Sequence, residues 1–151
     1  MNVLVDTNLL TRSIQPTSRH FGAATAAILE LKRRGERLCV VPQIAYEFWA
    51  VCTRPPGENG LGMSVAAAAT EQSRVLSLFA LLEDAPAVFP EWRRLVVAHD
   101  VKGKNSHDAR IVAAMNIHGV STILTFNAAD FRRYPGISVL DPQSVVAPTS
   151  P

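Results

Sequence analysis

The stretch "MNVLVDTNLL" at residues 1–10 decides the fold class of this chain. Residues 2–5 form a short run rich in valine and leucine, which is typical of a strand covered on both faces. The run ends at Asp6, and Thr7 and Asn8 add two more hydrogen-bonding side chains. A turn explains an acid in this place, and so does a metal site at the end of the strand. The rest of the chain has to distinguish the two.

The composition is that of an ordinary globular domain. The chain has 151 residues, of which 48% are hydrophobic and 19% are charged, and its net charge is +2. This length and composition predict a single domain at residues 1–141, followed by a frayed tail at 142–151. The overall charge indicates no polyanionic partner, so any basic surface has to be local.

The sequence also favours a cytoplasmic protein with no membrane partner. Its apolar start is too short for a signal peptide and carries an acid at position 6. No apolar run reaches the roughly 20 residues that a membrane helix requires. Cys39 and Cys52 lie in apolar stretches without a C-x-x-C spacing, as expected of reduced core cysteines.

Segments with strand character alternate with helical segments along the chain. Apolar residues at helical spacing mark the helices, and Gly35 and Gly119 are placed to end two of them. The alternation predicts a mainly parallel sheet with helices on both faces, which is a three-layer α/β/α sandwich. We expect strands at 2–5, 37–41, 121–127 and 137–142, and helices at 21–34, 42–54, 64–78, 87–99 and 106–118. Residues 79–84 fit either the end of a helix or a short strand, and we favour the strand.

Four acidic residues share one edge of that predicted sheet. Asp6 ends the first strand, and Asp130 follows the fourth. Glu47 and Asp108 lie near the starts of two helices. In a parallel sheet, helix starts and the carboxyl ends of strands meet at the edge where ligands bind. Each acid alone has an ordinary explanation as a turn, cap or solvated helix residue, but the set of four indicates a binding site.

The chemistry of such a site follows from its charge. Carboxylates brought close together repel and raise one another's pKa values. A hard divalent cation such as Mg²⁺ removes the conflict, because it prefers oxygen ligands and keeps several waters. The ion also polarises a phosphoryl oxygen and lowers the pKa of a bound water. Thr7 and Asn8 fit as hydrogen-bond donors that orient the acids or the waters.

Four stretches together resemble the PIN-domain nucleases, and most closely the VapC-type toxins of toxin–antitoxin pairs. They are "VDTNLL", the glutamate in "IAYEFWAVCTRP", "VKGKNSHDARIVAAM" and "ILTFNAADFRRYPGI". The resemblance implies an α/β/α sandwich and a Mg²⁺- or Mn²⁺-dependent endoribonuclease that acts as a homodimer and is controlled by an antitoxin. It assigns Asp6, Glu47 and Asp108 to the family's acids. Many members carry a further acid where this chain has Asn127, and Asp130 is the nearest carboxylate.

Basic residues near the predicted acidic edge are candidates for binding the RNA backbone. For each of them, scattered solubilising charge is an equally good explanation. The loop "GENGLG" at residues 57–62 is interpreted as a flexible connector, with a loop at the RNA-binding edge as the alternative. The basic candidates are Arg12, Lys102, Lys104, Arg110, Arg132 and Arg133.

Two other functions remain open from the sequence. The amide at Asn127 is consistent with a PIN-like module that binds RNA or protein without catalysis. The start "DTNLL" also resembles the D-x-D-x-T opening of haloacid-dehalogenase-type phosphatases, although Asn8 and Leu10 leave that motif incomplete. Metal-dependent RNA cleavage explains more of the chain than either alternative.

Overall fold

The computed structural model describes residues 1–147 and contains one five-stranded sheet, in which all neighbouring strands are parallel. The strands follow the order β3-β2-β1-β4-β5. The predicted mainly parallel sheet is therefore confirmed, and the short strand expected within 79–84 is present. The strand bounds are β1 Asn2–Val5, β2 Arg37–Val40, β3 Ala80–Leu81, β4 Thr122–Leu124 and β5 Ser138–Leu140.

The strand β1 occupies the centre of the sheet. It pairs with β2 on one side and β4 on the other, and Val3, Leu4 and Val5 have no exposed surface. The chain moves outward from β1 through β2 to β3, then returns to the opposite side of β1. The strand order thus reverses between β1 and β4, which is where parallel sheets form a ligand-binding crevice.

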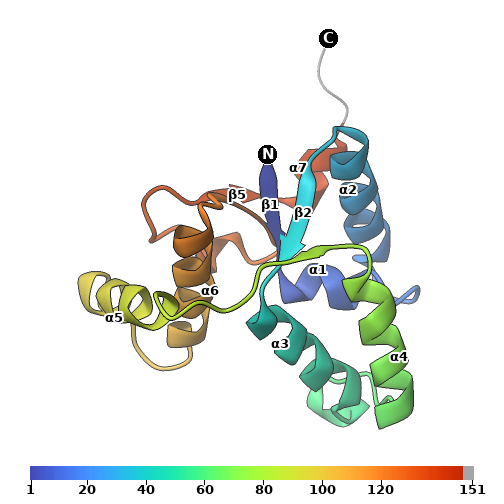
Figure 1. The fold of residues 1–151 in the computed structure, drawn as a ribbon. Coiled ribbons are helices and arrows are strands. Elements are labelled where there is room, and N and C mark those ends of the chain that lie inside the picture. Colours follow the sequence, from blue (N-terminus) through green and yellow to red (C-terminus); the bar gives the residue numbers. More distant parts are fainter. Residues whose placement is uncertain (148–151) are drawn as a thin grey trace.

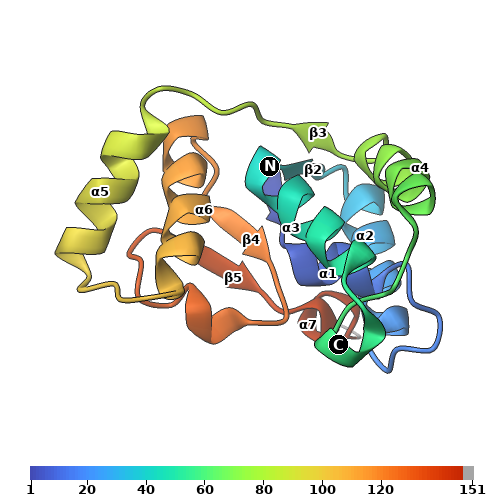
Figure 2. The same ribbon diagram turned by 90° about the horizontal axis from the view of Figure 1, so that it is seen from below.

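Helices cover both faces of the sheet, so the three-layer α/β/α sandwich is confirmed (Figures 1 and 2). On one side α5 packs against α6, and on the other α2 packs against α7. The helices α1 and α3 directly follow β1 and β2 and contact each other. The bounds are α1 Thr7–Arg12, α2 Phe21–Arg33, α3 Pro42–Thr53, α4 Val65–Leu76, α5 Val88–Ala98, α6 Asn105–His118 and α7 Pro142–Val146, with 3-10 turns η1 Pro56–Glu58 and η2 Ala128–Asp130.

Local sequence signals set several of these boundaries. Gly35 (φ +80°) and Gly119 (φ +67°) adopt the left-handed conformation just past α2 and α6, as expected of helix stops. Ser64 caps α4, because its Oγ accepts a hydrogen bond from the backbone N–H of Ala67 (3.1 Å). Pro90 lies in the first turn of α5, where the missing N–H has no helical partner to lose.

The C-terminal segment differs from its prediction as a frayed tail. Residues Pro142–Val146 form α7, which Asp141 caps by accepting a hydrogen bond from the N–H of Gln143 (2.7 Å). Val145 is buried against α2, and its carbonyl accepts a hydrogen bond from the Arg34 guanidinium (2.9 Å). Burial and this long-range bond order the segment. Residues 148–151 of the predicted tail lie outside the described residues.

Two further segments also differ from the sequence prediction. The first is α1, a six-residue helix that follows Asp6 and was not expected. The second is β4, which ends at Leu124, whereas the predicted strand continued to Asn127. Between residues 1 and 147, no helix is both long and apolar enough to cross a membrane.

Candidate functional site

Asp6 lies at the reversal of strand order. Its backbone N–H donates to the carbonyl of Leu124 (3.0 Å), which extends the pairing of β1 with β4 by one residue. Asp6 then serves as the N-cap of α1, with an extended backbone (φ −73°, ψ 159°). Asp6 is therefore a helix cap, and the cap places a residue that is only 7% exposed at the ligand-binding edge of the sheet.

Three hydrogen bonds fix the Asp6 carboxylate. The backbone N–H of Thr7 donates to Oδ1 (2.8 Å), and the Thr125 hydroxyl donates to Oδ2 (2.7 Å). The side-chain amide of Asn8 also donates to Oδ2 (3.3 Å). The orientation of Asp6 is therefore set by α1 and by the segment that follows β4.

Thr125 is a site residue that sequence reasoning missed. It is fully buried, and its Oγ1 accepts hydrogen bonds from the Asn8 amide (3.2 Å) and the backbone N–H of Asn127 (2.9 Å) while it donates to Asp6. The Asn8 Oδ1 in turn accepts from the N–H of Phe126 (3.3 Å). The sequence signal that could have identified Thr125 is a polar residue directly at the end of an apolar strand.

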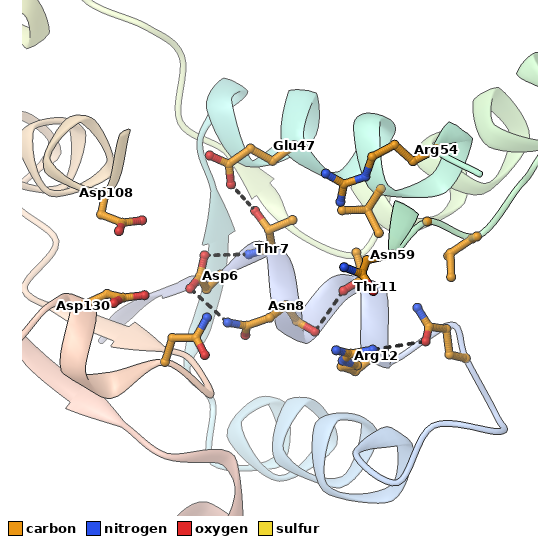
Figure 3. Close-up of a pocket in the computed structure, with 15 residues that line it drawn as sticks. Asp6, Thr7, Asn8, Thr11, Arg12, Glu47, Arg54, Asn59, Asp108 and Asp130 are labelled. Carbon is orange, nitrogen blue, oxygen red and sulfur yellow. Dashed lines mark hydrogen bonds between the residues drawn. The ribbon is translucent and has the colours of Figure 1, made fainter. Parts of the chain in front are cut away.

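Glu47 projects from α3 toward the same place (Figure 3). The Thr7 hydroxyl donates to its Oε2 (2.7 Å), and the Gln43 amide donates to its Oε1 (2.9 Å). Each carboxylate oxygen therefore has one donor from the protein and keeps a further lone pair for a ligand.

Gln43 is the second residue that sequence reasoning missed. It is buried one helical turn before Glu47, and its Nε2 also donates to the backbone carbonyl of His107 in α6 (2.8 Å). Its Oε1 accepts a hydrogen bond from Arg110 (3.1 Å), whose guanidinium also pairs with Asp84 (3.3 Å). Gln43 thereby ties α3 to the start of α6, where Asp108 is found.

Asp108 and Asp130 complete the acidic group. Asp108 is half-buried in the first turn of α6, and Asp130 is the exposed last residue of η2. Figure 3 shows both side chains pointing toward Asp6. The four acids proposed from the sequence line one cavity, together with Asn127.

The environment raises the pKa values of two of these acids. Burial is the largest cause of the rise in the pKa of Asp6 from 3.8 to about 6, and the charges of Glu47 and Asp130 add to it. The hydrogen bonds from Thr125 and Thr7 act in the opposite direction. The pKa of Asp108 also rises to about 6, first through burial and then through the charges of the other three acids. A bound cation would relieve this mutual repulsion.

The donor set fits a hard divalent cation. All four side chains are carboxylates, and the neighbouring Asn127 adds an amide oxygen to the lining of the cavity. Within residues 1–147, no group of three acidic, histidine or cysteine side chains is arranged to hold a metal ion by itself. An ion held here would therefore keep several waters, as Mg²⁺ does in most of its protein sites.

The cavity, of about 580 Å³, extends beyond the acids to a second, basic end. In Figure 3 the acids lie at one end, and Arg12, Arg54 and Asn59 lie at the other, with Thr7 and Asn8 between them. Arg12 was predicted from the sequence as an RNA contact, whereas Arg54 and Asn59 were not predicted. The remaining basic candidates, Lys102, Lys104, Arg110, Arg132 and Arg133, do not line this cavity.

The loop at residues 55–63 forms the wall at the basic end, and it is held firmly against α3. The N–H of Leu61 donates to the carbonyl of Val51 (2.9 Å), and the N–H of Gly62 donates to that of Arg54 (2.8 Å). Gly60 packs so closely that an added Cβ would lie 2.0 Å from the Arg54 carbonyl oxygen. The predicted flexible connector is therefore a well-packed wall of the cavity.

Fold and site together define a class of protein: a parallel α/β sandwich with an acidic, oxygen-donor cavity where the strand order reverses. The sequence profile of the PIN domain matches residues 3–137. The chain belongs to the PIN domain family, which confirms the resemblance noted from its motifs. No curated protein is significantly similar to it in sequence.

Solved structures with the same fold include several toxin–antitoxin proteins. VapBC2 from Rickettsia felis, solved with a DNA fragment from its promoter, superposes with a TM-score of 0.70 at 14% identity, covering 93% of this chain and 98% of that one. VapBC-1 from nontypeable Haemophilus influenzae gives 0.69 at 13% identity, covering 95% and 99%. VapC20 from Mycobacterium tuberculosis, a toxin that cleaves the sarcin–ricin loop, gives 0.59 at 16% identity, covering 80% and 86%.

Proposed function

We propose that this PIN-domain protein is a divalent-cation-dependent endoribonuclease and the toxin of a toxin–antitoxin pair. The observation that carries the proposal is the convergence of four carboxylates on one cavity, with the pKa values of Asp6 and Asp108 raised to about 6. Such a cavity repels a phosphodiester until a cation occupies it. The similarity to VapBC structures and to VapC20, a toxin that cleaves the sarcin–ricin loop, supports RNA as the substrate.

Each acid has a part in the proposed reaction. Asp6 and Asp108 would hold Mg²⁺ or Mn²⁺, with Glu47 and Asp130 contributing directly or through water. When bound, the ion supplies Lewis-acid polarisation of the phosphoryl oxygen and a water of lowered pKa. Thr7 and Thr125 keep Asp6 in place through their hydrogen bonds. Glu47, held by Thr7 and Gln43, retains lone pairs with which to accept a hydrogen bond from the attacking water and orient it.

The test is RNA cleavage by the purified protein. We expect cleavage with Mg²⁺ or Mn²⁺, none with EDTA, and a loss of at least 100-fold in Asp6→Asn, as is typical when a group central to transition-state stabilisation is removed. Asp100→Asn is the matched control, because Asp100 is exposed and its left-handed backbone (φ 48°) suits asparagine. Cleavage by Asp6→Asn at the wild-type rate would refute the mechanism, and turnover of a simple phosphomonoester instead of RNA would indicate a phosphatase.

Two observations favour a second candidate, a PIN-like module that binds RNA or protein without cutting. Asn127 lines the cavity where many family members carry an acid, and no complete ligand set is preformed among residues 1–147. This alternative predicts RNA binding without turnover and no heat of binding when millimolar Mg²⁺ or Mn²⁺ is titrated into the protein. Measurable metal affinity with RNA cleavage would exclude it.

The partners proposed for the chain follow from the same relatives. Because the similar structures are toxin–antitoxin complexes, we propose a cognate antitoxin. We also propose a homodimeric toxin, from the family resemblance of the motifs, and action in the cytoplasm, from the composition of the sequence. A short neighbouring reading frame whose product co-purifies with this chain and inhibits it would support the antitoxin. A monomeric mass from light scattering would contradict the homodimer.

A further inference from the structure

The basic end of the cavity has no role in holding a cation. Arg12 and Arg54 are exposed guanidiniums that line the same cavity as the four acids. None of the ion pairs formed within residues 1–147 includes either of them. Arg12 makes one long hydrogen bond to Gln15 (3.4 Å). Two cations without acidic partners thus face a shared hollow that also contains the acids.

The position of Arg54 is determined by the fold. Its backbone N–H donates to the carbonyl of Ala50 (3.0 Å) at the end of α3, and its own carbonyl accepts from Gly62 (2.8 Å). The close approach of Gly60 to that carbonyl holds the loop at residues 55–63 against the same point. The main chain of Arg54 is therefore anchored by α3 and by the loop at residues 55–63, which gives its side chain a rigid base at the cavity.

The lining of the cavity points to a phosphate as the ligand at this end. Arginine binds phosphate with paired hydrogen bonds. Gln15 and Asn59, which line the cavity together with Arg12 and Arg54, offer further amide donors. No aromatic side chain lines the cavity in the described part of the chain, so bases have no stacking platform here. The volume of about 580 Å³ is in the range of pockets that enclose whole organic ligands, and it exceeds the needs of one phosphate and its cation.

We propose that Arg12 and Arg54 bind the RNA phosphate that neighbours the scissile one. This inference rests on the proposed ribonuclease function and adds a second subsite to it. The acidic end takes the phosphodiester to be cut, and the basic end takes the next phosphate along the same strand. Contacts with phosphates position the RNA strand and carry no sequence information. The enzyme therefore favours a substrate with at least two consecutive phosphates over one that has only the scissile phosphate.

The experiment compares a dinucleoside monophosphate, which has only the scissile phosphate, with an oligoribonucleotide that contains the same step. We expect the wild type to cleave the oligoribonucleotide with much the higher kcat/KM. Arg54→Gln should lower kcat/KM on the oligoribonucleotide about 10-fold or more, mainly through KM, as expected when one charged hydrogen bond is lost. On the dinucleoside monophosphate Arg54→Gln should match the wild type, and Arg54→Lys should recover part of the loss.

The matched control is Arg93→Gln, which removes the same charge from an exposed position on α5 that does not line the cavity. Because one phosphate contact is lost, the dependence of log KM on log salt should fall by about 0.7 in Arg54→Gln and remain unchanged in Arg93→Gln. Equal kinetics for the two variants, or a wild type that cleaves both substrates equally well, would overturn the second subsite. Failure of the wild type to cleave either RNA would refute the ribonuclease proposal itself.

Discussion

Asp6 is held in its charged form by few interactions for a residue so deeply buried. Its three hydrogen bonds favour the carboxylate, yet burial and two neighbouring acids outweigh them and raise its pKa to about 6. A carboxylate that is destabilised in the folded protein and has no basic partner is more readily explained by function than by stability.

The stability of the wild type relative to Asp6→Asn should therefore depend on pH in a specific way. Between pH 3.8 and about 6 the folded wild type binds more protons at Asp6 than the unfolded wild type does, so its free energy of unfolding falls as the pH rises through this window. Above about pH 6 the folded wild type carries the full cost of a buried, ionised Asp6. In EDTA at pH 7.5, Asp6→Asn should be more stable than wild type by about 1–3 kcal/mol, and the gain should disappear near pH 4.

Urea unfolding at the two pH values measures this difference. Asp100→Asn is again the control, because it makes the same change of side chain at a position that is 83% exposed and does not line the cavity. If the difference in free energy of unfolding between Asp6→Asn and the wild type is the same at both pH values, the charge of Asp6 does not destabilise the folded protein.

At the level of elements, Gln43 connects three parts of the site: Glu47 on its own helix, the first turn of α6 through the His107 carbonyl, and Arg110. Gln43→Met keeps the shape but removes the hydrogen bonds, leaving buried polar groups without partners. We expect a loss of about 1–3 kcal/mol in the free energy of unfolding. We also expect lower kcat, because Glu47 loses one of its two donors.

Gln72→Met is the control for this substitution, since the Gln72 amide donates only to the Ala45 carbonyl, away from the acids. It should lower stability without lowering kcat in the folded protein. If Gln43→Met leaves kcat at the wild-type value, Gln43 has a purely structural role.

The loop between η1 and α4 gives a second prediction for this scale. Gly60→Ala would place a Cβ 2.0 Å from the Arg54 carbonyl oxygen, so the loop has to move away from α3. We expect KM for an oligoribonucleotide to rise by about the same factor as in Arg54→Gln, roughly 10-fold, with kcat little changed. Gly57→Ala, where the added methyl meets nothing within 4 Å, should behave as wild type.

The elements also show what the sequence could and could not predict. Gly35, Gly119 and Ser64 are local signals, and each marks the helix end that it was expected to mark. Thr125 and Gln43 acquire their roles from partners 119 and 64 residues away, which no local pattern encodes. The loop at residues 55–63 was predicted to be flexible from its glycines, because the composition does not show the hydrogen bonds that Leu61 and Gly62 donate to carbonyls at the end of α3.

For the whole molecule, a cation at the proposed site should act as a stabilising ligand. An ion that binds only the folded state adds about 1.4 kcal/mol at ten times its Kd, which corresponds to a rise of a few degrees in Tm. Protons compete for Asp6 and Asp108, whose pKa values are about 6. The rise in Tm with Mg²⁺ or Mn²⁺ should therefore be larger at pH 7.5 than at pH 5.

Thermal unfolding with and without the metal measures this effect, and EDTA should reverse it. Asp108→Asn should reduce the rise at pH 7.5, whereas Asp100→Asn should not. An increase in Tm that is the same at both pH values, or the same in Asp108→Asn, would place the ion elsewhere on the protein.

The central position of β1 has a consequence for the order in which a ribosome makes this protein. Strand β1 is flanked by β2, which follows soon after it in the chain, and by β4, whose Thr122 pairs with Val3. Until translation has passed Thr125, the N-terminal strand lacks one neighbour and Asp6 lacks a hydrogen-bond donor from the far side. The centre of the sheet and the hydrogen bonding of Asp6 are therefore completed only after Thr125 has been synthesised, 119 residues after Asp6 itself.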